Sequence, residues 1–288
     1  MLLILMYHRA FAAPECRLLD SDSPASAEPA GTLAPWHRPR RRAGDHRLGA
    51  GNPVPVLQAH FEYLRRRFDV VLPGEPLHPR RLSVCLSFDD AYADFYAHVF
   101  PLLEKFSLRA VLAVPTAFII PQTSLPMEER LSVTQNEAML GEVFRSKAPF
   151  CTWEELRQMV SSGRVQVASH SHRHPDLRRA DVDAAFEVSH SKSLLEQNLG
   201  CRVSTFVYPF GAVNARAHHT VMRHYSFAMR VGSALNSGWY PHRQPLCRVE
   251  ADNAPDIARR LRWNRLAALG LKWMANGLRA TAGKWQSL

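Results

Sequence analysis

Apolar residues recur along this chain in two alternating patterns, short continuous runs and longer segments with a helical period. The runs predict buried strands, and the periodic segments predict amphipathic helices. The expected strands cover residues 1–6, 69–72, 83–88, 109–114, 165–169, 203–208 and 226–230. The expected helices cover residues 57–68, 91–106, 182–199 and 215–224, with one more between Thr152 and Gly163. Strands that alternate with helices predict βαβ units and a parallel sheet or barrel, an α/β fold.

Two helix ends carry clear local signals. Thr152 followed by Glu155 forms a capping-box pattern at the start of one helix, and Gly163 fits its end. Gly200 fits the end of the helix over residues 182–199. These signals support the alternating pattern independently of hydrophobicity.

The pattern divides the chain into four parts: a first barrel strand in residues 1–13, an insertion in 14–55, the main domain in 56–255 and a tail in 256–288. The insertion has seven prolines, an arginine-rich run and no apolar period. It is expected to be flexible, and we favour a solvated loop over a basic arm that binds an anionic partner.

The tail combines basic residues with tryptophans and leucines and has no acid after Asp256. Two interpretations stay open: a basic interfacial helix on an anionic membrane surface, or a helix that packs on the main domain.

Composition is that of an ordinary globular protein, with 46% hydrophobic and 22% charged residues among 288 and a net charge of +10. The five cysteines form no CxxC pair and predict free thiols in a reducing compartment. The apolar start has no basic n-region and is interrupted after six residues, and no run reaches the length of a membrane span. We therefore expect a cytoplasmic protein, with membrane association only through the tail. Nucleic acid is not an expected partner, because no known basic recognition motif occurs.

Polar side chains follow three of the predicted strands. Asp89 and Asp90 end one run, His170 and His174 follow a second, and Pro209-Phe210-Gly211 ends a third. Functional groups of parallel α/β proteins gather at the carboxyl ends of strands, so these segments should converge.

Two carboxylates and two histidines four residues apart predict a divalent-metal site, with one carboxylate left over as a base. Ser171 could tie the intervening turn together, and Asp176 could orient a ligand histidine. Paired acids also cap helices, so the aspartates alone are a weak signal. His8 and His172 are interpreted as packing or solvated residues.

Taken together, the segments resemble the polysaccharide deacetylase family, the NodB-homology carbohydrate esterases. The first family motif, TFDDG, corresponds to Ser87-Phe88-Asp89-Asp90-Ala91, and the second, H[ST]xxH, corresponds to residues 170–174. The third corresponds to Val207-Tyr208-Pro209-Phe210-Gly211. The likeness runs from the first strand to about Val249.

The resemblance implies a distorted, incomplete (β/α) barrel of about seven strands and hydrolysis of N-acetyl or O-acetyl groups from a glycan. It implies that Asp89 is the general base, that Asp90, His170 and His174 hold one divalent metal ion, and that the backbone N–H of Phe210 stabilises the oxyanion. Tyr208 and Pro209 would line the substrate site. Zinc is the first choice for the metal, with cobalt, nickel or manganese as alternatives.

The sequence departs from the family pattern in three places. Ala91 replaces a glycine, Val207 stands where many members carry an arginine that steadies the base, and no LxH motif supplies a general acid. His242 is the candidate for that acid. A deacetylase acting on an acetylated glycan remains the first hypothesis. The alternatives are a hydrolase of another non-peptide C–N bond and a glycan-binding barrel without turnover. The sequence does not identify the oligomeric state.

Overall fold

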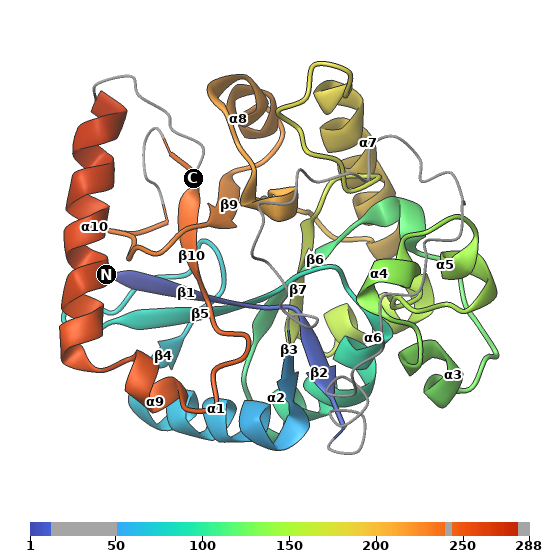
Figure 1. The fold of residues 1–288 in the computed structure, drawn as a ribbon, viewed down its shortest axis with the longest axis horizontal. Helices are drawn as coiled ribbons and strands as arrows, with labels where there is room; N and C mark the ends of the chain where they lie inside the picture. The colour runs from blue at the N-terminus through green and yellow to red at the C-terminus, as the bar shows by residue number, and fades with distance from the viewer. Residues whose placement is uncertain (13–50, 240–243, 282–288) are drawn as a thin grey trace, which may run out of the picture.

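Parallel strands form the centre of the computed structural model, which describes residues 1–12, 51–239 and 244–281 (Figure 1). The strands are β1 (Leu2–Tyr7), β4 (Asp69–Val70), β5 (Ser83–Phe88), β6 (Ala110–Val114), β7 (Val165–Ser169), β8 (Thr205–Val207), β9 (Phe227–Val231) and β10 (Leu246–Glu250). They are hydrogen-bonded in the order β1-β10-β9-β8-β7-β6-β5-β4, every neighbouring pair is parallel, and β1 also pairs with β5. That pairing closes the sheet, so the expected (β/α) barrel is confirmed.

The membership of the barrel differs from the sequence prediction in one strand. The predicted strand over 69–72 is the short β4, which pairs only with β5 and lies outside the ring. Its place in the ring is taken by β10, which the sequence analysis did not predict. β10 joins β1 to β9, and its central arginine is fully buried. A charged residue in the middle of a short run argues against a buried strand unless a partner for the charge is known.

Helices cover the outside of the ring. They are α1 (Val54–Arg67), α2 (Phe100–Phe106), α6 (Trp153–Ser161), α7 (Ala184–Leu199), α8 (Ala215–Met222), α9 (Ile257–Arg260) and α10 (Trp263–Thr281), with the short α3 (Met127–Leu131), α4 (Gln135–Ala138) and α5 (Val143–Ser146) between β6 and α6. The predicted capping box of α6 is present, with Thr152 accepting from the Glu155 N–H. Gly200 ends α7 with a positive φ of 64°, a conformation that glycine adopts without strain.

The helix predicted over 91–106 is interrupted. Residues Phe95–Val99 form a π-helical turn, and an α-helix follows only from Phe100. Pro101 has no N–H to donate to the carbonyl of residue 97, so a regular α-helical ladder cannot run through this segment. The π turn begins five residues after Asp90.

Side chains of the strands form two separate apolar layers. Inside the ring, a cluster includes Ile4, Cys85, Ala168, Val207 and Leu246. A larger cluster between the ring and the helices contains alternate strand residues such as Leu3, Leu86 and Val167. Because side chains alternate along a strand, the inward residues nearest the carboxyl ends face one another at the mouth of the ring.

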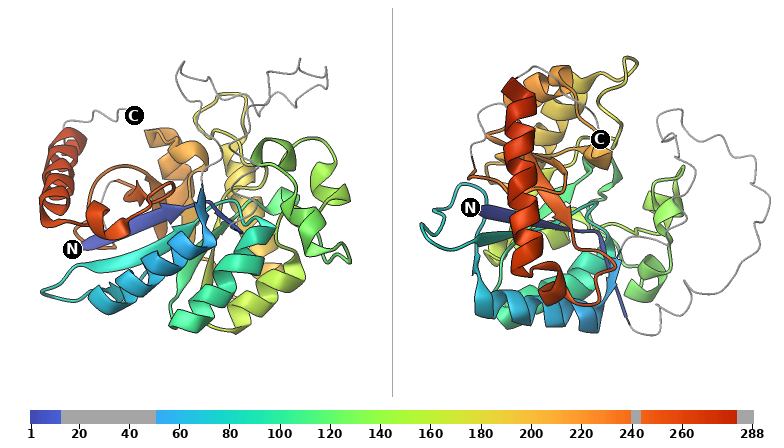
Figure 2. Two further views of the ribbon diagram at one scale, coloured as in Figure 1. Left: turned by 60° about the horizontal axis from the view of Figure 1, so that its bottom comes forward. Right: turned by 60° about the vertical axis from the view of Figure 1, so that its left-hand side comes forward.

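The limits of the predicted insertion shift at its end. Gly51–Pro53 forms β3, which pairs in parallel with β2 (Arg9–Phe11), and α1 begins at Val54. The rest of the insertion lies outside the described residues. Within residues 1–12, 51–239 and 244–281, no helix is both long and apolar enough to cross a membrane. Figure 2 shows α10 beside the amino-terminal end of β1.

Candidate active site

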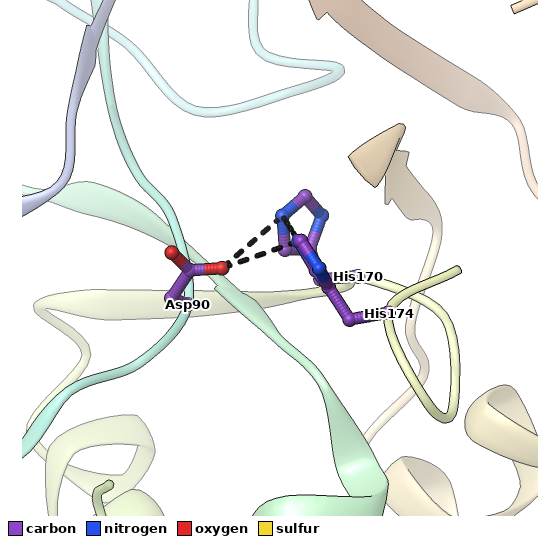
Figure 3. A group of neighbouring side chains, drawn as sticks. All are labelled: Asp90, His170 and His174. Atoms are coloured by element: carbon purple, nitrogen blue, oxygen red, sulfur yellow. Dashed lines mark hydrogen bonds and ion pairs between the residues drawn. The ribbon is translucent and has the colours of Figure 1, made fainter. Parts of the chain in front are cut away.

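Three predicted metal ligands come together at the carboxyl ends of β5 and β7 (Figure 3). The Asp90 carboxylate points at both imidazoles, with its Oδ1 3.5 Å from His170 Nε2 and 3.4 Å from His174 Nε2. The two Nε2 atoms are 3.1 Å apart. All three residues are buried. Side chains separated by about eighty residues in sequence therefore meet as the motif spacing predicts.

The chain turns sharply after β5, and this turn gives the two aspartates different surroundings. Asp90 and Ala91 have φ angles of 69° and 53°, so the strand has ended before Asp90. Asp89 continues the inward alternation of Cys85 and Ser87, whereas the left-handed turn brings Asp90 towards the histidines. Ala91 takes the left-handed conformation that a glycine would adopt freely, at a cost of roughly 1–2 kcal/mol.

The turn between the two histidines is held by side chains on both sides. Ser171 Oγ accepts from the His174 N–H at 3.0 Å, and the Ser169 hydroxyl accepts from the Ser171 N–H at 3.2 Å. From α7, the Glu187 carboxylate accepts from the N–H groups of His172 and Arg173, at 2.9 and 2.7 Å. Glu187 is only 4% exposed. Glu187 was not among the predicted site residues, because it lies on α7, outside the histidine motif.

A divalent cation fits the chemistry of these three ligands. His170 Nδ1 donates to the Val207 carbonyl at 2.8 Å, which leaves the lone pair of Nε2 directed at Asp90. Asp90 Oδ1 is buried and has no hydrogen-bond partner among the described residues. Burial raises the pKa of Asp90, and the adjacent Asp89 charge adds to this, against the opposing charges of His170 and His8. An orphaned carboxylate oxygen facing two imidazole nitrogens is the pattern expected where a cation is held.

Asp89 is bound on its other side by an arginine from β10. Arg248 donates from its two terminal nitrogens to the two carboxylate oxygens, at 2.5 and 2.8 Å, and also donates to Ser87 Oγ at 3.0 Å. Arg248 is fully buried. Burial alone would raise the pKa of Asp89, but the charge and hydrogen bonds of Arg248, with smaller contributions from His170 and His8, hold it well below its ordinary value. Asp89 is therefore ionised at neutral pH.

This ion pair explains the departure at Val207. The Val207 side chain belongs to the apolar cluster inside the ring, and the backbone carbonyl of Val207 accepts the hydrogen bond from His170 Nδ1. The cation beside Asp89 is present, but it comes from β10 instead of β8. Arg248 was not among the predicted site residues, and only a predicted strand over residues 246–250 would have pointed to it.

His8 lies at the site, contrary to its interpretation as a packing or solvated residue. Its Nδ1 is 2.5 Å from Asp252 Oδ2, and its Nε2 is 3.9 Å from Asp89 Oδ2. Burial opposes the charged form, but the hydrogen bond to Asp252 and the charges of Asp252, Asp89 and Asp90 raise the pKa of His8 to about 9. His8 follows β1 directly, so the same rule that placed the aspartates at a strand end applied to it.

The third motif contributes one exposed residue. Phe210 has a φ of 59°, is 49% exposed, and its ring lies 4.7 Å from the His174 ring. Tyr208 is fully buried, and its hydroxyl bonds to His218 Nδ1 on α8 at 2.9 Å. Pro209 is also buried. The side chains of Tyr208 and Pro209 therefore do not line a substrate surface, which corrects the sequence prediction for these two.

Two further predicted residues stand apart from the ligands. Asp176 accepts from Arg178, with the shortest contact 2.7 Å, and the Nδ1 of His170 is held by a backbone carbonyl instead. His170 is therefore not oriented by Asp176, and the expectation that Asp176 orients a ligand histidine stays a prediction for His174. His242 lies outside the described residues.

Known proteins share both the sequence pattern and the fold. The family model for polysaccharide deacetylase matches residues 78–228, just over half of the chain. Poly-beta-1,6-N-acetyl-D-glucosamine N-deacetylase of Escherichia coli is 27% identical over 146 residues, which are 47% of this chain and 20% of that protein. The chain thus matches only about a fifth of the length of this relative.

Solved structures agree on the fold. The deacetylase PplD of Streptococcus pyogenes, in complex with acetate, superposes with a TM-score of 0.61 at 17% identity, covering 93% of this chain and 97% of that one. IcaB from Ammonifex degensii gives 0.58 at 18% identity, covering 93% and 96%. With the match of the family model to residues that include the aspartate pair and both histidines, the chain belongs to the polysaccharide deacetylase family, the NodB-homology carbohydrate esterases.

Proposed function

We propose that this protein is a metal-dependent deacetylase that removes N-acetyl groups from a glycan. The observation that carries the proposal is the arrangement of Asp90, His170 and His174 around one point, with an ionised carboxylate, Asp89, beside them. The E. coli relative acts, by its name, on a polymer of β-1,6-linked N-acetylglucosamine. Such an exopolysaccharide is our first choice of substrate.

Asp90, His170 and His174 would hold the metal, with zinc as first choice and cobalt, nickel or manganese as alternatives. A divalent cation bound there would polarise the amide carbonyl of the substrate and lower the pKa of the attacking water. Two nitrogens and one carboxylate leave further coordination positions open, as catalytic metal sites require.

Asp89 is the general base in this proposal. Arg248 keeps its carboxylate ionised and fixes its orientation, because both oxygens are engaged by the guanidinium group. The carboxylate takes a proton from water as the water oxygen bonds to the carbonyl carbon of the acetamide. The negative charge that develops on the carbonyl oxygen would be stabilised by the backbone N–H of Phe210.

His8 is the general acid in this proposal and takes the place of His242. An amine is a poor leaving group unless its nitrogen is protonated, so cleavage of the C–N bond needs a donor. His8, with its pKa raised to about 9, is protonated at neutral pH, and its Nε2 lies 3.9 Å from Asp89 Oδ2. Its proton would go to the leaving nitrogen, and the products are acetate and a free amino sugar. An amide nitrogen depends on protonation to leave more than an ester oxygen does, so a proton donor at this position favours the N-acetyl over the O-acetyl substrate.

The structure bears on the hypothesis of a barrel without turnover. That hypothesis rested on Ala91, on the missing arginine at Val207 and on the missing LxH histidine. Arg248 and His8 supply a cation and an imidazole beside Asp89, so the second and third reasons lose their force.

Acetate release from N-acetylated β-1,6-glucosamine oligomers tests the proposal, with chitooligosaccharides and small cyclic amides as comparison substrates. Asp89→Asn should abolish release while metal remains bound, and His170→Ala should abolish it through loss of metal. Release that persists undiminished in both variants would refute the assignment. Turnover of cyclic amides alone would establish the alternative C–N hydrolase.

A further inference from the structure

Helix α10 exposes apolar side chains on the side that does not pack on the barrel. Leu266 and Leu269 pack against the core. On another side, Trp263 is 83% exposed and Leu271 is 63% exposed. Trp263, Ala267 and Leu271 follow one another at intervals of four residues and therefore form one stripe along the helix. An exposed apolar stripe of this kind on a folded domain indicates a surface that binds another molecule or a membrane.

Exposed basic side chains lie on a different side of α10 from this stripe. Arg262, Arg265 and Lys272 are all exposed, and none forms an ion pair with an acid of the described chain. Arg265 and Lys272 are seven residues apart and so lie on the same side of α10. After Asp256 the sequence has no acidic residue to balance them. Tryptophan and leucine beside arginine and lysine are typical of helices that lie in the interface of an anionic membrane.

A second set of basic residues lies at the amino end of the barrel. Because all strands of the ring are parallel, the residues that precede them share one end of the molecule. Several arginines occupy these positions: Arg80 and Arg81 before β5, Arg164 before β7, Arg202 before β8 and Arg223 before β9. We call these five residues the arginine rim. None of the five pairs with an acid in the described part of the chain. Two exposed acids, Asp69 and Glu104, partly offset their positive charge.

Helix α10 lies at this same end. The Leu235 N–H donates to the Leu269 carbonyl at 3.3 Å, and the neighbouring Asn236 exchanges two backbone hydrogen bonds of 2.9 Å with Leu2. Leu2 is the first residue of β1, whereas the candidate active site lies where β1, β5 and β7 end. Figures 1 and 2 both show α10 next to the amino terminus.

We propose that α10 and the arginine rim dock this protein on the surface of an anionic lipid bilayer. Trp263 and Leu271 enter the interface, and Arg265 and Lys272 contact lipid phosphates, with the rim adding longer-range attraction. Since the active site occupies the opposite end of the barrel, docking directs it away from the bilayer, where a polymer can reach it. This inference goes beyond the proposed deacetylation and does not depend on it.

Flotation of the full-length chain with vesicles tests this docking. Vesicles of equal parts phosphatidylglycerol and phosphatidylcholine should carry the protein at 0.1 M salt, and vesicles of pure phosphatidylcholine should not. Loss of two basic contacts, at about fivefold each, should weaken partitioning of the double variant Arg265→Gln/Lys272→Gln about 25-fold. Leu271→Ser should weaken it about tenfold.

The matched control is Arg145→Gln/Lys147→Gln, which removes two exposed positive charges at α5, in the connection that follows β6. It should bind vesicles like the unaltered protein, and every variant should release acetate from a soluble oligomer at the unaltered rate. Thus failure of docking and failure of the deacetylase proposal give different results.

Four outcomes would overturn the docking proposal. The first is absence of flotation with anionic vesicles, and the second is equal binding by the α10 variants and the control. The third is a concentration-dependent dimer that Leu271→Ser dissociates, since α10 would then be covered by a second copy. The fourth is oligonucleotide binding that competes with vesicle binding and keeps its affinity in Leu271→Ser, since the surface would then bind nucleic acid.

Discussion

Replacing Arg248 by methionine should damage this protein more than an ordinary core substitution, because it strands a buried charge. Arg248 is 0% exposed and Asp89 5% exposed at the side chain, and the pair is bidentate at 2.5 and 2.8 Å. Removing one partner of such a buried pair costs about 3–5 kcal/mol of the free energy of unfolding. We expect that loss at pH 7, together with loss of acetate release.

The loss should depend on pH in a definite direction. The pKa of Asp89 in the folded protein lies below its ordinary value, so the pair stabilises the fold fully above about pH 4. This contribution disappears as the pH falls towards the folded pKa. In the variant, the unpaired carboxyl can take up a proton instead of remaining charged. The difference in unfolding free energy between the two proteins should therefore be largest near neutrality and shrink on acidification.

Urea unfolding at several pH values, with a chelator present so that metal does not contribute, measures this difference. Arg130→Met is the matched control, since Arg130 is 3% exposed and forms a bidentate pair at 2.6 and 2.9 Å with Glu155 of α6, which is not a residue of the site. It should cost comparable stability but leave the turnover of the folded enzyme unchanged. A loss below about 1 kcal/mol for Arg248→Met, or additive effects with Asp89→Asn, would refute the reasoning.

Two further predictions concern residues that position others. Asp252→Asn should move the alkaline limb of the profile of kcat against pH from about 9 towards the ordinary histidine value. The reason is that protonated His8 is the donor, so activity is lost as the pH rises through the pKa of His8. A limb that does not move would exclude His8 as the acid. Glu187→Gln should weaken zinc binding about 10- to 100-fold, measured by chelator competition, since it loosens the turn between the two histidine ligands. The exposed Glu154→Gln is its control, and equal affinities would contradict the role.

The sequence predicted those parts of the site that depend on local patterns. Each metal ligand follows directly on an apolar strand run, and parallel strands place their carboxyl ends at one edge. An apolar run, a turn and a pair of histidines can each be recognised within ten residues of sequence. The alternation of strands with helices gave the barrel for the same reason.

The missed residues depend on contacts between distant segments. Arg248 meets Asp89 across 159 residues of sequence, and His8 meets Asp252 across 244. Both contacts exist because β1 pairs with β5 on one side and with β10 on the other. No local pattern reveals that closure. Moreover, a buried arginine makes its strand resemble a loop until its carboxylate partner is known.

The position of the arginine can itself be tested, because a side chain on another strand of the ring could also be directed at Asp89. Val207 lies inside the ring on β8, and its carbonyl accepts from Nδ1 of His170, which lies at the same site as Asp89. If Arg248 acts only by reaching that carboxylate, an arginine at Val207 should replace it. The exchange Arg248→Val/Val207→Arg should then recover part of the stability and acetate release lost in Arg248→Val, whereas Val207→Arg alone should destabilise the fold by crowding two cations. An exchange variant no better than Arg248→Val would mean that the pairing needs the position on β10, and not merely a guanidinium group inside the barrel.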